Sequence, residues 1–373
     1  MEVIQARGLL VQLLPECGPP LITIPMHITL VDDSIPFDGY SPGNRPLGGA
    51  EKAFASLAAA LARRGHEVHA CNRARFPLTI EGVSWDGWDK LPSQTDALIA
   101  WRKPALLGAV RMASKRFLWT TATGAQLQAA RKGIESYSAT LIINSVPQIE
   151  GLKITEAMPV RLVVPGVRAE FVADLPTQLS ERPTAVVTSH PSHGLSKLLV
   201  LWKEQIQPQL PNARLLVVSA SLDKAQRNAE MSLEVPEALV PLLAQIKLAE
   251  DAGVQVVPPR GDAGMAEIYR SARVHLYPGH AEDMVGWTLL DSQACGLPAV
   301  VKNLGGAKER IRDGQTGQLV PDDAAMVNLT VRLLTDDDTF WGMSRDARLL
   351  QRERSWDVAA AEFDALLRAG DKK

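Results

Sequence analysis

The chain has 373 residues, of which 46% are hydrophobic and 22% are charged, and its formal net charge is −2. This length exceeds what one hydrophobic core needs and suits two domains. The near-neutral charge argues against a nucleic-acid partner, because nucleic-acid binders are usually basic overall. Seven histidines and the cysteines Cys17, Cys71 and Cys295 lack metal-ligand spacing, so we expect no metal. So few cysteines, in an odd number, fit a reducing cytoplasm.

The first 25 residues read as an extension preceding the fold. The run "GLLVQLLPECGPPLITIP" is apolar, but its four prolines break it well short of a membrane span. It also lacks the basic lead-in and the small-residue cleavage site of a signal peptide. Met26 directly precedes "HITLV", which reads as a first core strand. We therefore expect residues 1–25 to be a disordered N-terminal extension, such as an upstream start codon would add.

Strand-like and helix-like runs alternate from Met26 onward. After "HITLV" come a glycine-rich loop, a helical run over residues 51–65, and the strand-like runs "HEVHACN", "DALIAW", "RFLWTT", "TLIINS" and "RLVVP". A second series begins with "TAVVTS" and ends with "GQLVP", followed by the amphipathic "SWDVAAAEFDALLRAG". Such alternation predicts parallel sheets covered by helices on both faces.

We predict an α/β architecture of two Rossmann-like, doubly wound domains that face each other across a cleft. Ligands of such sheets lie outside the carboxyl ends of the strands, where the strand order reverses. The expected boundaries are an N-terminal domain over 26–170, a linker over 171–180, a C-terminal domain over 181–340, and a closing helical segment over 341–373 that packs back on the first domain.

Several familiar catalytic signatures are missing from the sequence. The chain contains no G-x-G-x-x-G that opens a helix, no P-loop, no G-x-S-x-G and no H-E-x-x-H. The acidic triplet Asp336–Asp338 in "TDDDTFW" resembles a metal-binding run. Because carboxylates favour the first turn of a helix, we expect these residues to cap the helix that follows.

Two pairs of glycines follow strand-like runs. Gly48 and Gly49 in "PLGGAE" remove side chains where a helix N-terminus would present free N–H groups and positive dipole. Gly305 and Gly306 in "NLGGAKE" repeat the arrangement in the second series. Both pairs suit a phosphate group, and an ordinary strand-to-helix turn is the alternative.

Two carboxylates flank the start of a predicted helix in the second series. Asp283 lies in the loop after the strand-like "VHLYP", and Asp291 lies just over one turn into a helix that begins near Trp287. A carboxylate accepts two hydrogen bonds side by side, which matches the vicinal diol of a ribose or hexose. Carboxylates for sugar hydroxyls beside glycines for phosphate indicate a nucleotide-sugar site.

These residues resemble the retaining family-4 glycosyltransferases of GT-B fold, among the group 1 glycosyl transferases. The resemblance rests on Asp283 and Asp291, which occupy the two acidic positions of the family, and on "ACGLPAV", "GGAKE" and "DGQTG". The N-terminal "GGAEKAFASLAAALARRGHEV" and the closing "SWDVAAAEFDALL" are also similar. The resemblance extends from Met26 to about Arg368.

The resemblance implies a retaining, metal-independent hexosyltransferase without a cofactor. Its partners would be a nucleotide-sugar donor and a cell-envelope, lipid-linked or polysaccharide acceptor, and its place the cytoplasm, peripheral on the inner face of the membrane. Asp283 would be the catalytic position against the transferred sugar, and Asp291 would bind the ribose hydroxyls. Gly48, Gly49, Gly305 and Gly306 would line the diphosphate. The leaving phosphate would take the acceptor's proton, so no enzymic base pair is expected.

The sequence departs from the family at several positions. Both family glutamates are aspartates here. The arginine and lysine expected for the diphosphate are replaced by Thr188 or Ser189 and by His193, and Arg260 in "PPRGD" is a candidate substitute cation. These departures leave an alternative open: a GT-B-like protein that binds a nucleotide-sugar or glycan without turnover.

A basic stretch spans residues 97–134, which contain seven lysines and arginines and no acid. Arg102, Lys103, Lys115 and Arg116 are its candidate contact residues. Each basic residue near an anionic surface contributes about 1 kcal/mol. The stretch thus predicts a patch for an anionic membrane or a lipid-linked acceptor, and a solvated face is the alternative.

Overall fold

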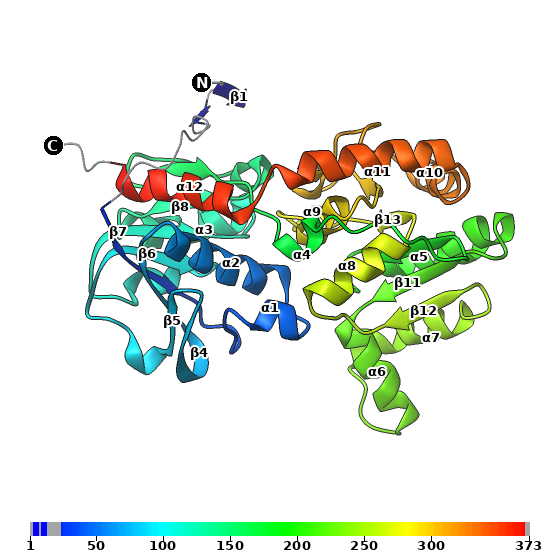
Figure 1. Ribbon diagram of the computed structural model, residues 1–373, viewed down its shortest axis with the longest axis horizontal. Helices are drawn as coiled ribbons and strands as arrows, with labels where there is room; N and C mark the ends of the chain where they lie inside the picture. Colours follow the sequence, from blue (N-terminus) through cyan, green and yellow to red (C-terminus); the bar gives the residue numbers. More distant parts are fainter. Residues whose placement is uncertain (1–2, 7–8, 13–23, 370–373) are drawn as a thin grey trace. The chain divides into compact units, whose positions relative to one another are not determined.

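The computed structural model describes residues 3–6, 9–12 and 24–369, which form two compact units (Figure 1). The first unit takes the chain up to Arg168 together with the segment from Arg354 on, and the second unit is Ala169–Glu353. These boundaries differ from the expected ones. α4 (Ala169–Val172), which crosses the expected start of the linker, packs on helices of the second unit, and so does α11 (Asp337–Arg352). The chain therefore rejoins the first unit at Arg354 and not at 341.

The sheet of the first unit has seven parallel strands in the order β5-β4-β3-β6-β7-β8-β9. Its chain starts in the middle, runs outward to one edge, and returns to add strands on the other side, so the strand order reverses between β3 and β6. The strands are β3 (His27–Val31), β4 (Glu67–Ile80), β5 (Val83–Gly87), β6 (Gln94–Trp101), β7 (Met112–Trp119), β8 (Thr140–Ile143) and β9 (Val160–Leu162).

The connections of the first unit are less helical than the alternation predicts. β4 bends, so that its first residues pair parallel with β5 and its last three, Leu78–Ile80, pair with β5 in the opposite direction before a turn joins the two strands. The next two connections carry only the short η1 (Trp88–Lys90) and η2 (Pro104–Gly108). The other helical segments are α1 (Ser41–Asn44), α2 (Gly49–Arg63), α3 (Gly124–Glu135), η3 (Val146–Ile149) and α12 (Trp356–Arg368). The C-terminal α12 packs along α2 (Figure 1), so the chain ends on the unit in which it began.

The second unit repeats this topology with six parallel strands in the order β12-β11-β10-β13-β14-β15. The order reverses between β10 and β13. The strands are β10 (Thr184–Val187), β11 (Arg214–Val218), β12 (Val254–Val257), β13 (Val274–Tyr277), β14 (Ala299–Lys302) and β15 (Gly317–Val320).

Helices surround this second sheet, and its largest core cluster lies between the strands and α5, α7 and α10. Asp336 accepts a hydrogen bond from the backbone N–H of Thr339 at 3.0 Å and so caps α11, which confirms the predicted cap. The remaining segments are α5 (Leu195–Leu201), η4 (Trp202–Ile206), η5 (Gln207–Gln209), α6 (Ala220–Glu230), η6 (Glu237–Leu239), α7 (Val240–Leu248), α8 (Asp262–Ser271), α9 (Trp287–Ala294), η7 (Ala307–Arg310) and α10 (Asp323–Thr335).

Most of the predicted N-terminal extension lies outside the described residues. Within it, β1 (Val3–Ala6) and β2 (Leu9–Gln12) pair with each other antiparallel and join neither larger sheet. The predicted disorder therefore does not apply to these two segments.

Across the described part of the chain, no helix combines the length and the apolar character needed to cross a membrane.

Candidate functional site

The second sheet places three loops together at its carboxyl edge. β10 and β13 are neighbours at the reversal of strand order, and β14 is next to β13. The carboxyl ends at such a reversal are where ligands of doubly wound sheets bind. His193 follows β10 and Asp283 follows β13, while the backbone N–H of Gly306, after β14, donates to the carbonyl of Asp283 at 2.8 Å. The fold thus unites residues that are more than 100 positions apart in the sequence.

Position 305 requires a glycine, because a residue with a side chain would not fit there. Its φ is +57°, and a Cβ atom there would lie 2.4 Å from the carbonyl oxygen of Asp283. The close approach explains Gly305 better than a helix dipole does, because the helix predicted after it is only the four-residue η7. That part of the sequence interpretation is corrected, since the dipole of one turn is small.

The Asp283 carboxylate is held by its own loop. Its Oδ1 accepts hydrogen bonds from the backbone N–H groups of Val285 at 3.3 Å and Gly286 at 3.0 Å, and its Oδ2 accepts from the Tyr277 hydroxyl. Burial first, and the Asp283 charge second, hold the pKa of Tyr277 well above its ordinary value. A carboxylate offers about four lone-pair sites, so these three bonds leave about one for a ligand.

Asp291 lies on α9, half-buried, on the second turn of that helix. After burial itself, its charge is the largest influence that raises the pKa of the fully buried Tyr269 on α8. The two aspartates therefore differ in surroundings. Asp283 accepts hydrogen bonds within the loop before α9, and Asp291 interacts electrostatically with Tyr269 of α8.

A neutral hydrogen-bond network connects β10, β13 and α9. The Thr188 hydroxyl donates to Thr288 Oγ1 at 2.8 Å and lies 2.9 Å from His275 Nε2. His275 Nδ1 lies 2.8 Å from the Ser292 hydroxyl, and burial lowers the pKa of His275 to about 3, so its ring is uncharged. Thr188, one of the two residues that stand where the arginine was expected, is thus part of an uncharged network.

Three histidines gather where that arginine and lysine were expected. The rings of His193 and His280 stack with centroids 4.3 Å apart and an interplanar angle of 9°. His190 lies 5.3 Å from His193, ring to ring. We call His190, His193 and His280 the histidine cluster. The sequence reading missed His280, although its place directly after β13, beside the loop of His193, was the available signal.

Gly48 and Gly49 lie in the first unit, where Gly48 precedes α2. The N-terminus of this helix already has a carboxylate of its own: a Cβ on Gly48 would lie 2.4 Å from Glu51 Oε2. Arg102 binds Glu51 at 3.0 Å and also Asp32, which is buried, at 3.1 Å. Two acids with one arginine would repel a phosphate, so this turn suits a neutral, hydroxylated group better than the predicted diphosphate.

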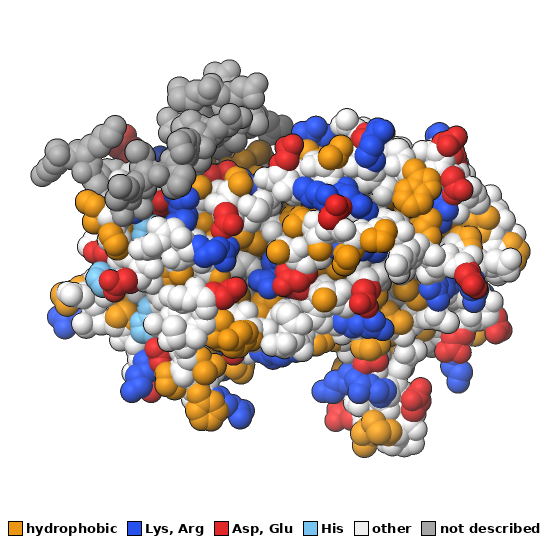
Figure 2. All heavy atoms as spheres, in the orientation of Figure 1, with side chains coloured by type: hydrophobic (Ala, Val, Ile, Leu, Met, Phe, Trp, Pro, Cys, Tyr) orange, Lys and Arg blue, Asp and Glu red, His pale blue; other side chains and the backbone are white. Residues whose placement is uncertain are grey.

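The four candidate residues of the predicted basic patch all have partners within the chain. Lys103 binds Asp33 at 2.6 Å, and Lys115 donates to the carbonyl of Leu367 at 2.6 Å. Arg116 donates to four backbone carbonyls of residues 107–113. Arg102 pairs with Asp32 and Glu51, so all four candidate residues have partners within the chain. Counting the charges of residues 97–134 does not reveal these partners. On the face drawn in Figure 2, basic and acidic side chains are interspersed.

Arg260 lies apart from the three loops. It follows β12, which is separated from β10 by β11, and its nearest ionic neighbour is Glu267 at 3.8 Å. It lines a cavity of about 590 Å³ together with Leu175, Leu216, Val257 and Ile268. The structure therefore does not support Arg260 as the substitute for the missing diphosphate cations.

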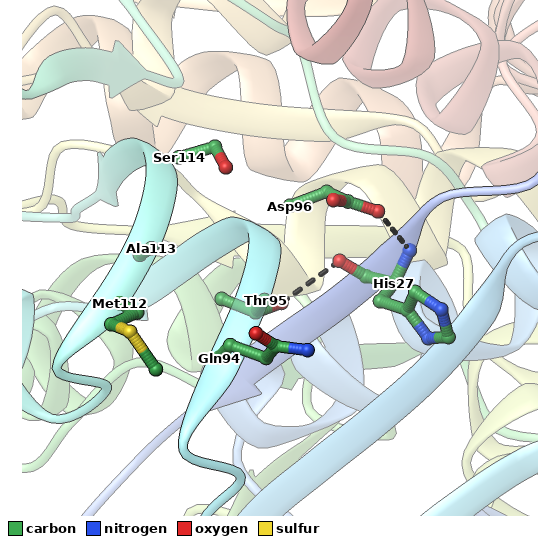
Figure 3. A pocket seen from close by; sticks show the side chains of 7 residues that line it. All are labelled: His27, Gln94, Thr95, Asp96, Met112, Ala113 and Ser114. Carbon is green, nitrogen blue, oxygen red and sulfur yellow. Dashed lines mark hydrogen bonds between the residues drawn. The ribbon is translucent and has the colours of Figure 1, made fainter.

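A second cavity, of about 500 Å³, lies in the first unit (Figure 3). Its lining comes from the first residues of β3, β6 and β7, including His27, Gln94 and Met112. It therefore opens at the amino ends of the strands, opposite to the edge where ligands of such sheets bind. None of the predicted site residues lines it.

Within the described residues, no three His, Cys, Asp or Glu side chains are arranged to hold a metal ion.

Comparison with known proteins finds a family that matches part of the second unit. Residues 184–336 match the family described as glycosyl transferases, group 1. The D-inositol 3-phosphate glycosyltransferase of Gordonia bronchialis is 27% identical over 177 residues, which are 43% of this chain and 38% of that protein. The enzyme of the same name from Acidothermus cellulolyticus is 39% identical over 101 residues, or 26% of this chain and 22% of that protein. The matched regions thus span less than half of these relatives.

Solved structures share the fold of the whole described chain. Sucrose-phosphate synthase from Thermosynechococcus elongatus has a TM-score of 0.67 at 18% identity, covering 92% of this chain and 98% of that chain. WaaG, a glycosyltransferase involved in lipopolysaccharide biosynthesis, has a TM-score of 0.65 at 14% identity, covering 92% and 100%. Anabaena HepE, in complex with UDP and glucose, has a TM-score of 0.63 at 16% identity, covering 92% and 100%. The predicted GT-B fold is confirmed.

Proposed function

We propose that this chain, whose residues 184–336 match the group 1 glycosyl transferases, transfers a sugar from a nucleotide-sugar to a hydroxyl acceptor. One observation carries the proposal: the loops after β10, β13 and β14 meet at the reversal of strand order, with Gly305 in a position that only glycine fits. The UDP-glucose complex of the structurally similar HepE supports a nucleotide-sugar donor.

The resemblance suggests a role for each residue of the site. Asp291 binds the ribose hydroxyls, and the one lone-pair site left on Asp283 accepts a hydroxyl of the transferred sugar. Gly305 and Gly306 have no side chains, which lets the diphosphate of the donor approach the loop closely. The acceptor is a cell-envelope, lipid-linked or polysaccharide hydroxyl, and the names of the inositol phosphate relatives support a polar polyol as a further class.

The proposed reaction retains the configuration of the sugar and needs no metal or cofactor. The bond between the anomeric carbon and the phosphate oxygen breaks, and the acceptor oxygen bonds to the same carbon on the same face. The acceptor proton goes to the leaving phosphate oxygen. An enzymic general base is therefore unnecessary, which agrees with an Asp283 carboxylate that is largely committed to its own loop.

A second function is favoured by one specific observation. Thr188 belongs to an uncharged network, so the site has no fixed cation at that position to stabilise a leaving diphosphate. A protein that binds the nucleotide-sugar without turnover would tolerate this loss better than an enzyme.

A ligand panel tests both functions. Thermal unfolding would be followed with UDP-, GDP-, ADP- and CMP-sugars, and the stabilising sugar would then be offered with polyol, glycan and lipid-linked acceptors. A ligand at 100 times its dissociation constant stabilises by about 2.7 kcal/mol. We expect one nucleotide class to stabilise and to release its nucleoside diphosphate when an acceptor is added. Stabilisation without release in any mixture would favour the binding protein, and no stabilisation by any sugar would overturn both.

A further inference from the structure

The histidine cluster brings three titratable rings onto two adjacent loops. His190 and His193 follow β10, while His280 follows β13, and the stacked pair has ring centroids 4.3 Å apart. His280 Nδ1 accepts a hydrogen bond from the backbone N–H of Glu282 at 3.2 Å. While the ring is neutral, this bond leaves its hydrogen on Nε2.

Two opposing influences act on His193. The acids Glu282 and Asp283, on the loop after β13, favour a charged His193 ring. Burial, and then the other two histidines, act in the opposite direction and lower the pKa of His193. From α5 and β14, Lys197 and Lys302 share the carboxylate of Asp323, at 2.5 and 2.7 Å.

Without a ligand, burial and the neighbouring rings oppose protonation of His193. Stacked imidazoles that both carry charge repel each other, and Glu282 and Asp283 compensate only in part. A multiply charged anion beside the rings favours their protonation, because it stabilises each added positive charge. Histidine is the side chain whose charge changes near neutral pH.

We propose that the histidine cluster binds the phosphate groups of the ligand in its protonated form, so that binding takes up protons and weakens as the pH rises. This inference rests on the proposed function, since it assigns the phosphate end of the donor to these side chains. It also gives the site a dependence on pH that a fixed arginine and lysine would not have.

The sign of the dependence follows from linkage. If the bound state holds more protons than the free state, the association constant falls with increasing pH, by up to about tenfold per pH unit for each proton taken up. We expect about three- to tenfold weaker binding per unit between pH 6.5 and 8.5. A site made of permanent cations would show no such slope.

The experiment titrates the full chain with inorganic pyrophosphate and with the nucleoside diphosphate of the stabilising sugar. Calorimetry at pH 6.5, 7.5 and 8.5, in buffers of different ionisation enthalpy, gives affinity and proton uptake together. His193→Gln should abolish the uptake, and His193→Lys should bind with little dependence on pH. His280→Gln is a second variant, and circular dichroism would verify that each variant folds. His27→Gln removes an exposed histidine of the first unit and should behave as wild type.

The outcomes separate the inference from the proposed function. Proton uptake that disappears in His193→Gln supports the inference, even if no sugar is ever transferred. Binding of either ligand without proton uptake, or uptake that survives in both glutamine variants, overturns it while leaving sugar transfer intact. Failure of pyrophosphate and nucleoside diphosphate to bind at any pH also overturns it.

Discussion

The attachment of the C-terminal helix α12 to the first unit depends on one buried carboxylate. Asp364, whose side chain is 3% exposed, accepts hydrogen bonds from Arg64 Nη2 at 2.9 Å, Arg368 Nε at 2.6 Å and His66 Nε2 at 3.1 Å. Burial alone would raise its pKa, but the hydrogen bonds from His66 and Arg64 hold the pKa of Asp364 well below the ordinary value. We predict that Asp364→Asn is strongly destabilising.

The magnitude follows from what the substitution leaves behind. Removing one partner of a buried ion pair costs about 3–5 kcal/mol, because the other charge stays buried and unpaired. Arg64 and Arg368 keep 25% and 26% of their side-chain area exposed, so water compensates for part of that loss. We therefore expect a decrease of about 2–4 kcal/mol in the free energy of unfolding.

The same helix supplies a matched control. Asp357 pairs with Arg63 of α2 at 2.8 Å, but these side chains are 65% and 48% exposed. Such surface pairs contribute about 0–1 kcal/mol. Urea unfolding at pH 7, followed by circular dichroism, would compare Asp364→Asn and Asp357→Asn with the wild type. Equal losses in the two variants would refute the reasoning.

The pH dependence gives an independent check. The folded-state pKa of Asp364 lies below its unfolded value, so its contribution is complete above about pH 4 and is lost as the pH falls further. The stability difference between the wild type and Asp364→Asn should be constant from pH 7 to about 5 and should shrink below about 4. A difference that grows on acidification would contradict this assignment.

Three further predictions concern the second unit and the buried thiols. Gly305→Ala should destabilise the chain by about 1–3 kcal/mol, because the backbone there is left-handed and the new Cβ would meet a carbonyl. Gly133→Ala, in open space on α3, should instead stabilise the chain by about 0.5–1 kcal/mol. Urea unfolding measures both changes, and effects of the opposite sign would contradict the prediction. Asp291→Ala should weaken nucleotide-sugar binding roughly 10- to 150-fold, from a loss of about 1.5–3 kcal/mol, with the circular dichroism spectrum unchanged; calorimetry showing equal affinity would remove Asp291 from the site. Burial raises the pKa of both Cys71 and Cys295 to about 12, so neither should react with iodoacetamide in the folded chain at pH 8, and peptide mass spectrometry that finds either one alkylated would contradict this.

The sequence was sufficient where short-range patterns determine structure. The strand-like "HITLV" and "VHLY" are β3 and β13, and the predicted helix from Trp287 is α9. Asp336 caps α11 as its position in an acidic run predicts. Gly305 was identified correctly as a position that must lack a side chain, although the reason is a neighbouring carbonyl and not a helix dipole.

The sequence was insufficient where partners come from distant segments. Arg102 stands in a stretch without acids, yet it binds Asp32 and Glu51, which precede it by 70 and 51 positions. The hydrogen bonds of the Asp283 carboxylate within its own loop depend on how the chain turns after β13. The periodicity of the sequence does not predict that turn. The sequence does not show that the loop of His280 lies beside the loop of His193, because the parallel pairing of β10 with β13 brings the two loops together.

Hydrogen exchange of the full chain tests the location of the nucleotide-sugar site most directly. Amide exchange would be measured by mass spectrometry with and without the sugar nucleotide that stabilises the chain. We predict protection in the three loops that follow β10, β13 and β14, at residues 188–194, 278–286 and 303–307, together with the start of α9. Protection confined to other segments, such as the lining of the cavity at the amino ends of β3, β6 and β7, would contradict the site.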